Sequence, residues 1–453
     1  MSKAFDEAAL AGLILQAAER IDAPARAGAV RHMLDTVGVA IAGAREPAPR
    51  IVIDALAGGA GSPAGNAGSP CTVFGTALRT EADLAVLCNA MSGHLHDFDD
   101  DEAQVSYSHV SVPVLAAVWA EGERMGASGR EVVDAYLLGV ETMLFFGRLL
   151  NPEHYARGWH ASATLGVFGA AAAVSVLRRM PRSRLAAALA LAATMSSGVR
   201  SAFGSDGKPF QLARAAQSGY LAANLADRGL VARDTIFGPM GFLDLYGGRV
   251  APDAIDRAAA LLGAPFGLVT PGVTIKAFPS CTATHAAIEM AIGLARESGA
   301  GAEEVEAIRV GVGRGVPGIL IHDRPVSALQ GKFSMPFCVA GGFHFGRMGI
   351  AEFQDASIAL PQISALIPRV SMVERDDQAD LLAATMELTL KDGRSFVREI
   401  TDPLGSPARP LSDEDLRAKF LACVEPALGA ARAVEAHDAL SHVLDAGRLP
   451  ALN

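Results

Sequence analysis

The sequence predicts a mainly α-helical fold, in which a large all-helical domain is joined to a smaller α+β lid domain. Aromatic residues make up only 6% of the chain, whereas alanine and glycine are abundant, and this composition favours closely packed helices over a β-sandwich. Apolar residues recur at helical spacing through most of the first part of the chain. After residue 267, alternating segments typical of strands enter the pattern, so the two parts of the chain differ in fold class.

Helices follow one another in the first part, beginning with 22–43, where apolar residues lie on one helical face. Thr80, followed three residues later by Asp83, resembles a capping box at the start of a helix that ends at Leu95. The other segments predicted here are a loop at 58–70, a short strand at 71–74 and helices at 111–125, 129–147, 160–177, 183–197 and 211–228.

Strands and helices alternate in the second part. Residues 305–312 alternate as a strand does, and 386–390 with 395–400 predict a β-hairpin that turns at Asp392 and Gly393. Helices are predicted at 282–297 and 335–345.

The chain then returns to helical structure, because Ser412 caps a further helix after a proline-rich link. We therefore predict a helical domain made of residues 1–267 and 404–453, and an α+β lid domain made of residues 268–403.

The composition argues against several classes of function. A net charge of −10 disfavours a nucleic-acid partner. The most apolar runs, 165–177 and 185–199, fall short of the roughly 20 residues of a membrane-spanning helix. Acidic residues near the start do not fit a signal peptide. The five cysteines form no CxxC pair, which disfavours a zinc site and a disulfide framework and fits the cytoplasm.

The most informative segment runs from His94 to His109 and is dense in histidine and aspartate. His94, His96 and Asp97 resemble the metal ligands of some hydrolases. The other histidines show no second paired motif, so we predict no metal. The acidic residues 99–102 are interpreted as a solvated loop. His109 precedes a predicted helix, where it can act as an acid–base group near neutral pH or merely cap the helix.

Further candidates each have an ordinary alternative. His160, in the first turn of an alanine-rich helix, can present its imidazole to an anion or simply help to cap the helix. Lys208 lies just before a predicted helix, and Lys276 lies where the α+β part begins. Each can bind a carboxylate or be an ordinary exposed lysine. Cys281 is interpreted as a buried thiol. Together these groups predict a pocket for a substrate with several carboxylates, beside one of which a proton is moved.

Six blocks of sequence resemble, in order, the MmgE/PrpD family, which includes 2-methylcitrate dehydratase, cis-aconitate decarboxylase and iminodisuccinate epimerase. The resemblance extends over most of the chain. The blocks are HMLDTVGVAIAGA (32–44), NAMSGHLHDFDD (89–100), GWHASAT (158–164), GKPFQLARAAQSGYLAANLADRG (207–229), IKAFPSCTATH (275–285) and GKFSMPFCVA (331–340).

The resemblance implies a cofactor-free homodimer whose active site lies between the helical domain and the lid. It implies that the substrate is a small anionic carboxylic acid. By position in the blocks, the expected catalytic residues are Asp97, His109, Lys208 and Lys276. The expected substrate-binding residues are His160 and the same two lysines, and we add Asp101 to them.

Some positions depart from the family pattern. Asp101 stands where the family commonly has threonine, and His109 is followed by Val110 instead of proline. Gln211 stands where many members have histidine, and Cys281 stands where the decarboxylase-like members have histidine. An acid beside an anionic substrate is unfavourable unless it points away or pairs with a cation. These changes argue against cis-aconitate decarboxylase.

Three functions are therefore compared. The first is a lyase that removes a proton α to a carboxylate and expels hydroxide, as in 2-methylcitrate dehydration. In that enzyme His109 would be the acid–base group, oriented by Asp97, and the lysines with His160 would hold carboxylates. The second is an epimerase of an amino-dicarboxylate such as iminodisuccinate. A non-catalytic helical binding protein is disfavoured, because five polar groups occupy the family's positions.

Overall fold

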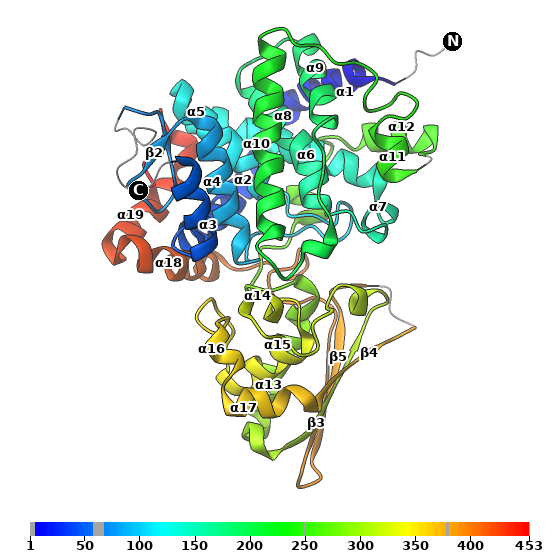
Figure 1. Cartoon of the computed structure of the whole chain (residues 1–453), viewed down its shortest axis with the longest axis vertical. Coiled ribbons are helices and arrows are strands. Elements are labelled where there is room, and N and C mark those ends of the chain that lie inside the picture. Colours follow the sequence, from blue (N-terminus) through cyan, green and yellow to red (C-terminus); the bar gives the residue numbers. More distant parts are fainter. Residues whose placement is uncertain (1–4, 58–67, 249, 377–379, 453) are drawn as a thin grey trace.

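The computed structural model describes residues 5–57, 68–248, 250–376 and 380–452. Figure 1 shows a large helical part and, below it, a smaller domain that contains a sheet, which confirms the predicted fold class. The exact domain limits at 267/268 and 403/404 stay a prediction. Most of the loop expected at 58–70 lies outside the described residues.

Fourteen α-helices of the described chain form the helical part, and the last two of them follow the smaller domain in sequence. They are α1 (Glu7–Ala17), α2 (Ala23–Gly43), α3 (Pro47–Val52), α4 (Ala82–Leu95), α5 (Ser111–Met125), α6 (Gly129–Leu150), α7 (Glu153–Ala156), α8 (Ala161–Leu177), α9 (Arg182–Ala193), α10 (Gly207–Asp227), α11 (Phe242–Gly247), α12 (Pro252–Ala260), α18 (Asp413–Leu428) and α19 (Ala430–Ser441).

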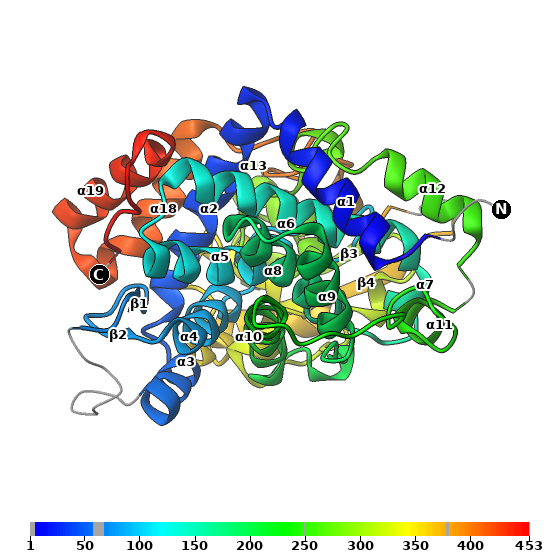
Figure 2. The same cartoon turned by 90° about the horizontal axis from the view of Figure 1, so that it is seen from above.

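Helix α8 lies at the centre of this part, with α5, α6, α9 and α10 around it (Figure 2). Small residues allow the close packing that the composition predicts. A Cβ at Gly169 of α8 would lie 3.0 Å from the carbonyl oxygen of Gly139 in α6, and one at Gly219 of α10 would lie 2.4 Å from that of Val167. Larger side chains at these positions would push α8 away from α6 and α10, so the glycines allow the three helices to pack closely.

The smaller domain contains a four-stranded sheet in the order β4-β3-β5-β6. β3 runs parallel to β4 and antiparallel to β5, and β5 forms a hairpin with β6. Buried and exposed residues alternate along β5, because the sheet buries one face. The strands are β3 (Val305–Val312), β4 (Val370–Glu374), β5 (Ala384–Leu390) and β6 (Ser395–Ile400). The helices are α13 (His285–Ser298), α14 (Ala328–Gly331), α15 (Met335–Phe345), α16 (Asp355–Ile358) and α17 (Pro361–Leu366).

The chain returns to the helical part at its end. Phe420 and Val424 of α18 are buried in the same hydrophobic core as Val37 and Ile41 of α2. The second core cluster is formed by the smaller domain. The Ser412 cap of α18 is confirmed, since its hydroxyl accepts from the Asp415 N–H at 3.1 Å.

Several predicted elements have the observed limits, namely 111–125, 305–312, 335–345 and 395–400. The capping box at Thr80 is wrong. Helix α4 begins after Glu81, whose side chain makes no cap bond, and Thr80 instead pairs with Cys71 in a small hairpin of β1 (Cys71–Thr72) and β2 (Arg79–Thr80). β1 is therefore shorter than the predicted strand, and β4 was not predicted at all.

Two expectations from composition can be compared with the structure. Among the described residues, every helix is either too short or too polar to cross a bilayer. All five cysteines are free thiols, as the absence of CxxC pairs predicts.

Candidate active site

All six predicted site residues line one small cavity of about 50 Å³ at the junction between the helical part and the smaller domain. Asp97 and Asp101 follow α4, His109 precedes α5, and His160 and Lys208 lie at the starts of α8 and α10. Lys276 comes from the segment that enters the smaller domain. The residues brought together are Asp97, Asp101, His109, His160, Lys208 and Lys276.

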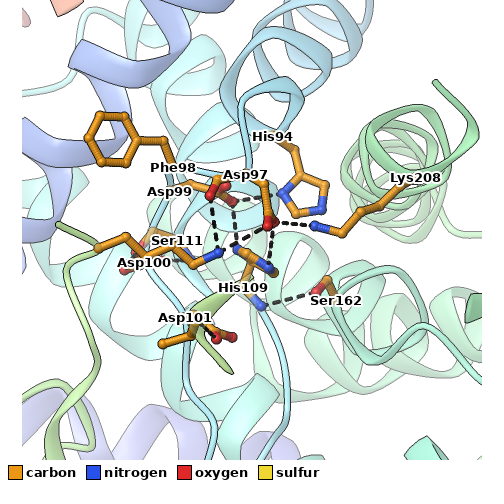
Figure 3. Close-up of polar contacts among 12 residues, drawn as sticks. His94, Asp97, Phe98, Asp99, Asp100, Asp101, His109, Ser111, Ser162 and Lys208 are labelled. Carbon is orange, nitrogen blue, oxygen red and sulfur yellow. Dashed lines mark hydrogen bonds and ion pairs between the residues drawn. The ribbon is translucent and has the colours of Figure 1, made fainter. Parts of the chain in front are cut away.

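Asp97 is the centre of the charged groups, as Figure 3 shows. Its Oδ1 accepts a hydrogen bond from Lys208 Nζ and lies 3.3 Å from Lys276 Nζ and 3.4 Å from His109 Nε2. Burial alone would raise the pKa of Asp97, but the two ammonium groups and His109 hold that pKa well below its ordinary value. Asp97 is therefore ionised at neutral pH, and its φ of 52° shows that the backbone takes a left-handed turn here.

Asp99 joins two imidazoles behind Asp97. Its Oδ2 lies 2.8 Å from Nδ1 of His94 and 3.1 Å from Nδ1 of His109. Burial opposes its ionisation, but the two histidines lower the pKa of Asp99 well below the ordinary value. Burial lowers the pKa of His94 to about 3, so His94 is neutral. Asp99 thus orients His109, whose Nε2 faces Asp97.

The same three residues offer a possible metal-ligand set. Atoms of His94, Asp99 and His109 lie within 4.8 Å of one another, and two histidines with one carboxylate can bind iron or zinc. However, both Nδ1 atoms already face Asp99 Oδ2, and the Lys208 ammonium repels positive charge at His94. The donor set thus fits a hydrogen-bonded triad better than a metal site, and the predicted absence of a metal stays a prediction.

The interpretation of residues 99–102 as a solvated loop is wrong, because three of its four acids are buried. Asp100 accepts from Ser111 and lies 2.6 Å from Nδ1 of His32. Glu102 accepts from the N–H groups of residues 104–106. These bonds fix the path of the loop from Asp97 to His109. The sequence could not reveal them, because a run of acidic residues is usually exposed.

His160 and Lys208 form the opposite wall. His160 is the N-cap residue of α8, and its Nδ1 contacts Gln211 Nε2 at 2.6 Å. Burial lowers the pKa of His160 well below the ordinary value. The Nζ of Lys208 lies 5.4 Å from the ring centres of both Phe203 and Phe333, within the range in which an aromatic ring attracts an ammonium group.

Asp101 and Cys281 lie on the side of the smaller domain. The Asp101 carboxylate accepts a hydrogen bond from the hydroxyl of Thr282, and its backbone pairs with Thr274. Asp101 also helps to keep Lys276 charged. Burial lowers the pKa of Lys276, but Asp97 and, after it, Asp101 raise this pKa above the ordinary value. Burial raises the pKa of Cys281 to about 12, so this residue is a neutral thiol in the cavity wall.

Two buried lysines that the sequence analysis did not single out hold the loop in place. Lys332 Nζ donates to the carbonyls of His96 and Pro279 at 2.8 and 2.9 Å. Lys419 Nζ donates to the carbonyls of Phe98 and Lys276, both at 2.8 Å. Each lysine therefore connects the Asp97 loop to the segment that contains Lys276. No local signal marks either lysine, because their partners, which for Lys419 also include the Asp35 carboxylate, are far away in sequence.

Known proteins resemble this chain over most of its length. The model of the MmgE/PrpD N-terminal domain matches residues 10–254, and that of the MmgE/PrpD C-terminal domain matches residues 278–442. Cis-aconitate decarboxylase of Mus musculus is 26% identical over 78% of this chain and 74% of its own length. Cis-aconitate decarboxylase of Aspergillus terreus is 24% identical over 77% of this chain and 76% of its own length.

Proposed function

The chain belongs to the MmgE/PrpD family, and from this premise we propose that it is a cofactor-free hydro-lyase resembling 2-methylcitrate dehydratase. Its substrate would be a small di- or tricarboxylic acid, which loses a proton α to a carboxylate and then hydroxide. The observation that carries the proposal is the convergence of two lysines and two histidines on the cavity around ionised Asp97.

The lysines supply the positive charge that such a reaction needs. Lys276 stays protonated, because burial is outweighed by Asp97 and the neighbouring acids, which raise its pKa. Each ammonium has three N–H donors. Lys208 donates one of them to the Asp97 carboxylate, and Lys276 donates one to the Asp97 carbonyl while its ammonium lies 3.3 Å from the carboxylate. The remaining donors can hold a substrate carboxylate and stabilise the enolate-like charge that forms when the α proton leaves.

His109 is the proposed acid–base group. Its imidazole lies in the cavity wall between two carboxylates, with Nδ1 beside Asp99 and Nε2 beside Asp97. In this role it accepts the α proton, and Asp97 and Asp99 stabilise the imidazolium that results. A protonated His109 can then assist the departure of hydroxide by giving up that proton.

A specific observation also favours a second function, epimerisation of an amino-dicarboxylate. The Asp101 carboxylate lies in the cavity wall, where a substrate amino or imino N–H could donate to it. Epimerisation requires proton donors on opposite faces of one carbon, and His109 together with Lys208 or Lys276 would supply them. Replacing Asp101 by Asn should then weaken the binding of amino-dicarboxylates about tenfold and leave hydroxy acids unaffected.

Of the three reactions, dehydration, epimerisation and decarboxylation, the last is the least favoured. The relatives named above are cis-aconitate decarboxylases, but they are only about a quarter identical to this chain. Here Cys281 is a neutral thiol at a position where decarboxylase-like members have histidine, so one ionisable group of that site is replaced.

One assay separates these reactions. The protein is incubated in D2O with a panel of citrate-like hydroxy acids, amino-dicarboxylates and cis-aconitate, and the products are followed by NMR and mass spectrometry. A hydro-lyase gives an unsaturated acid, an epimerase gives deuterated substrate of mixed configuration, and a decarboxylase releases CO2. If no member of the panel is converted, the proposal as a whole is contradicted.

We also propose that the enzyme works as a homodimer in the cytoplasm, as the family resemblance implies. Sedimentation analysis at micromolar concentration tests the first point. A monomer that retains full activity would contradict it.

A further inference from the structure

We infer that Gln211 fixes His160 as the neutral tautomer whose Nε2–H points into the cavity, so that His160 donates to the substrate and does not accept its proton. Gln211 is then a positioning residue. The inference rests on the proposed function for its catalytic meaning, but the tautomer itself can be measured without any substrate.

The orientation of the Gln211 amide is determined by one backbone residue. Val199 N–H donates to Gln211 Oε1 at 2.9 Å, and Gln211 Nε2 donates to the Val199 carbonyl at 3.0 Å. A peptide N–H can only donate and a peptide carbonyl can only accept. Turning the amide over would break both bonds, so the atom that faces His160 is Nε2.

The amide nitrogen has hydrogen atoms and no available lone pair, so its contact with His160 Nδ1 at 2.6 Å requires Nδ1 to accept. A neutral imidazole has one N–H, which must therefore be on Nε2. The His160 backbone is held as well, because its N–H donates to the Gly198 carbonyl at 3.1 Å, next to Val199. The imidazole and its partner are thus attached to the same short segment.

The other ring atom is available to a ligand. His160 lines the cavity and is only 1% exposed, and within the described parts of the chain its Nε2 has no hydrogen-bond partner. A buried N–H without a partner is costly. A carboxylate or enolate oxygen of the substrate would satisfy it.

Burial and the Lys208 ammonium favour the neutral form of His160. The groups that face His160 are Lys208 on α10, His94 at the end of α4, His109 before α5 and Asp97 in the loop between them. Burial comes first among the causes that lower its pKa, followed by His94, Lys208 and His109, while Asp97 acts in the opposite direction. His160 is thus a neutral donor, and proton transfer is left to His109.

The tautomer is tested by 15N NMR of the full-length protein labelled at histidine, with the His160 signals assigned by their loss in His160→Gln. We expect Nε2 to be protonated and Nδ1 to be unprotonated, without titration between pH 6 and 8. A proton on Nδ1, or titration of His160 in this range, would overturn the inference. Either result leaves the turnover assay unaffected, so failure of the inference can be distinguished from failure of the proposed function.

Gln211→Glu gives a second measurement with a readout that a purely structural role would not change. The new carboxylate should draw the proton to Nδ1 and raise the pKa of His160. At low pH the imidazolium still offers Nε2–H, whereas at high pH the lone pair of Nε2 faces the substrate. We expect kcat to fall about a hundredfold at pH 8 and much less at pH 6.

Two controls complete the experiment. Gln211→Met removes the amide without adding charge, so kcat should fall about tenfold at every pH. Gln217→Glu adds the same charge to α10, but its side chain donates to the Asp83 carbonyl, away from His160. It should behave as the wild type in both assays. A Gln211→Glu profile parallel to that of the wild type would contradict the positioning role.

Discussion

Two buried carboxylates in the helical part, Asp97 and Glu121, each lie between two cationic side chains, but they differ in how their oxygens are used. In α5, Glu121 accepts from Arg124 at 2.6 and 2.9 Å and from Arg178 at 2.6 and 3.1 Å, and Tyr220 adds a bond of 2.9 Å. Both Glu121 oxygens are thus occupied. Asp97 gathers its cations on Oδ1, and among the described residues Oδ2 has no hydrogen-bond partner.

The difference separates a structural ion cluster from a reactive one. All three Glu121 partners, Arg124, Arg178 and Tyr220, line a hollow of about 960 Å³ outside the cavity at Asp97, yet their charges and hydroxyl are already paired with Glu121. The smaller cavity at Asp97 is lined by residues with unpaired hydrogen-bonding atoms in the part of the chain that the structure describes, among them Asp97 Oδ2 and His160 Nε2. Unused hydrogen-bonding capacity therefore marks the site better than volume does.

The largest expected effect is at His109. His109→Gln should lower turnover about a thousandfold, because the acid–base group is lost while the side chain volume and a hydrogen-bonding end remain. The thermal midpoint should change little, which differential scanning calorimetry checks. Turnover within tenfold of the wild type would remove His109 from the mechanism.

A matched pair of variants tests the comparison directly. Asp97→Asn should lower kcat at least a hundredfold, because the lysines and His109 lose the charge that orients them. Glu121→Gln should leave kcat within twofold of the wild type but lower the free energy of unfolding by about 3 kcal/mol, because Arg178 stays buried without its acid. Turnover and chemical denaturation are measured on both proteins. A larger loss of turnover in Glu121→Gln than in Asp97→Asn would reverse the assignment.

The sequence alone predicts the fold class and the limits of many helices, because helical periodicity and hairpin turns are local signals. It does not predict β4, which is only five residues long and becomes a strand by pairing in parallel with β3, far away in sequence. Thr80 fails as a cap for a similar reason, since pairing with Cys71 takes the residue into a strand. Non-local pairing overrides the local preference in both cases.

The same limit applies to the site. Asp97, His109, His160, Lys208 and Lys276 could be named from their family positions, and the cavity does contain all of them. The burial of Asp99 and Asp100 could not be predicted, because a run of acidic residues in a sequence is usually exposed to solvent. Their partners, His94, His109 and His32, come from other helices and loops, so only the folded chain reveals that these acids are part of the polar network.

The response to pH should show where the two carboxylates behave alike. The folded-state pKa of each is lowered against the effect of burial: that of Asp97 by Lys208 and Lys276, and that of Glu121 by Arg124 and Arg178. A depressed carboxyl pKa stabilises the fold above the unfolded value of about 4 and loses that contribution as the pH falls through the folded value. The contribution of these two carboxylates to the thermal midpoint should thus be constant from pH 5 to 8 and should be lost below pH 4, in addition to the fall that the buried neutral histidines His94 and His160 cause below pH 6.5. Both Asp97→Asn and Glu121→Gln should make the drop in the thermal midpoint below pH 4 shallower. In either variant, a drop as steep as in the wild type would show that the replaced carboxylate does not cause it.

The smallest expected effect is that of metal removal, which tests how Asp99 differs from an ordinary ligand. If its oxygens hold His94 and His109 by hydrogen bonds alone, dialysis against a strong chelator should leave turnover within the error of the assay, and elemental analysis should find less than about 0.1 equivalent of zinc or iron. A loss of turnover that added metal restores would instead assign His94, Asp99 and His109 to a metal site. His94→Gln provides the control, since it removes one ligand of that site but keeps a side chain that can donate to Asp99. A metal enzyme would lose its ion in this variant. An enzyme with a hydrogen-bonded triad would keep most of its activity.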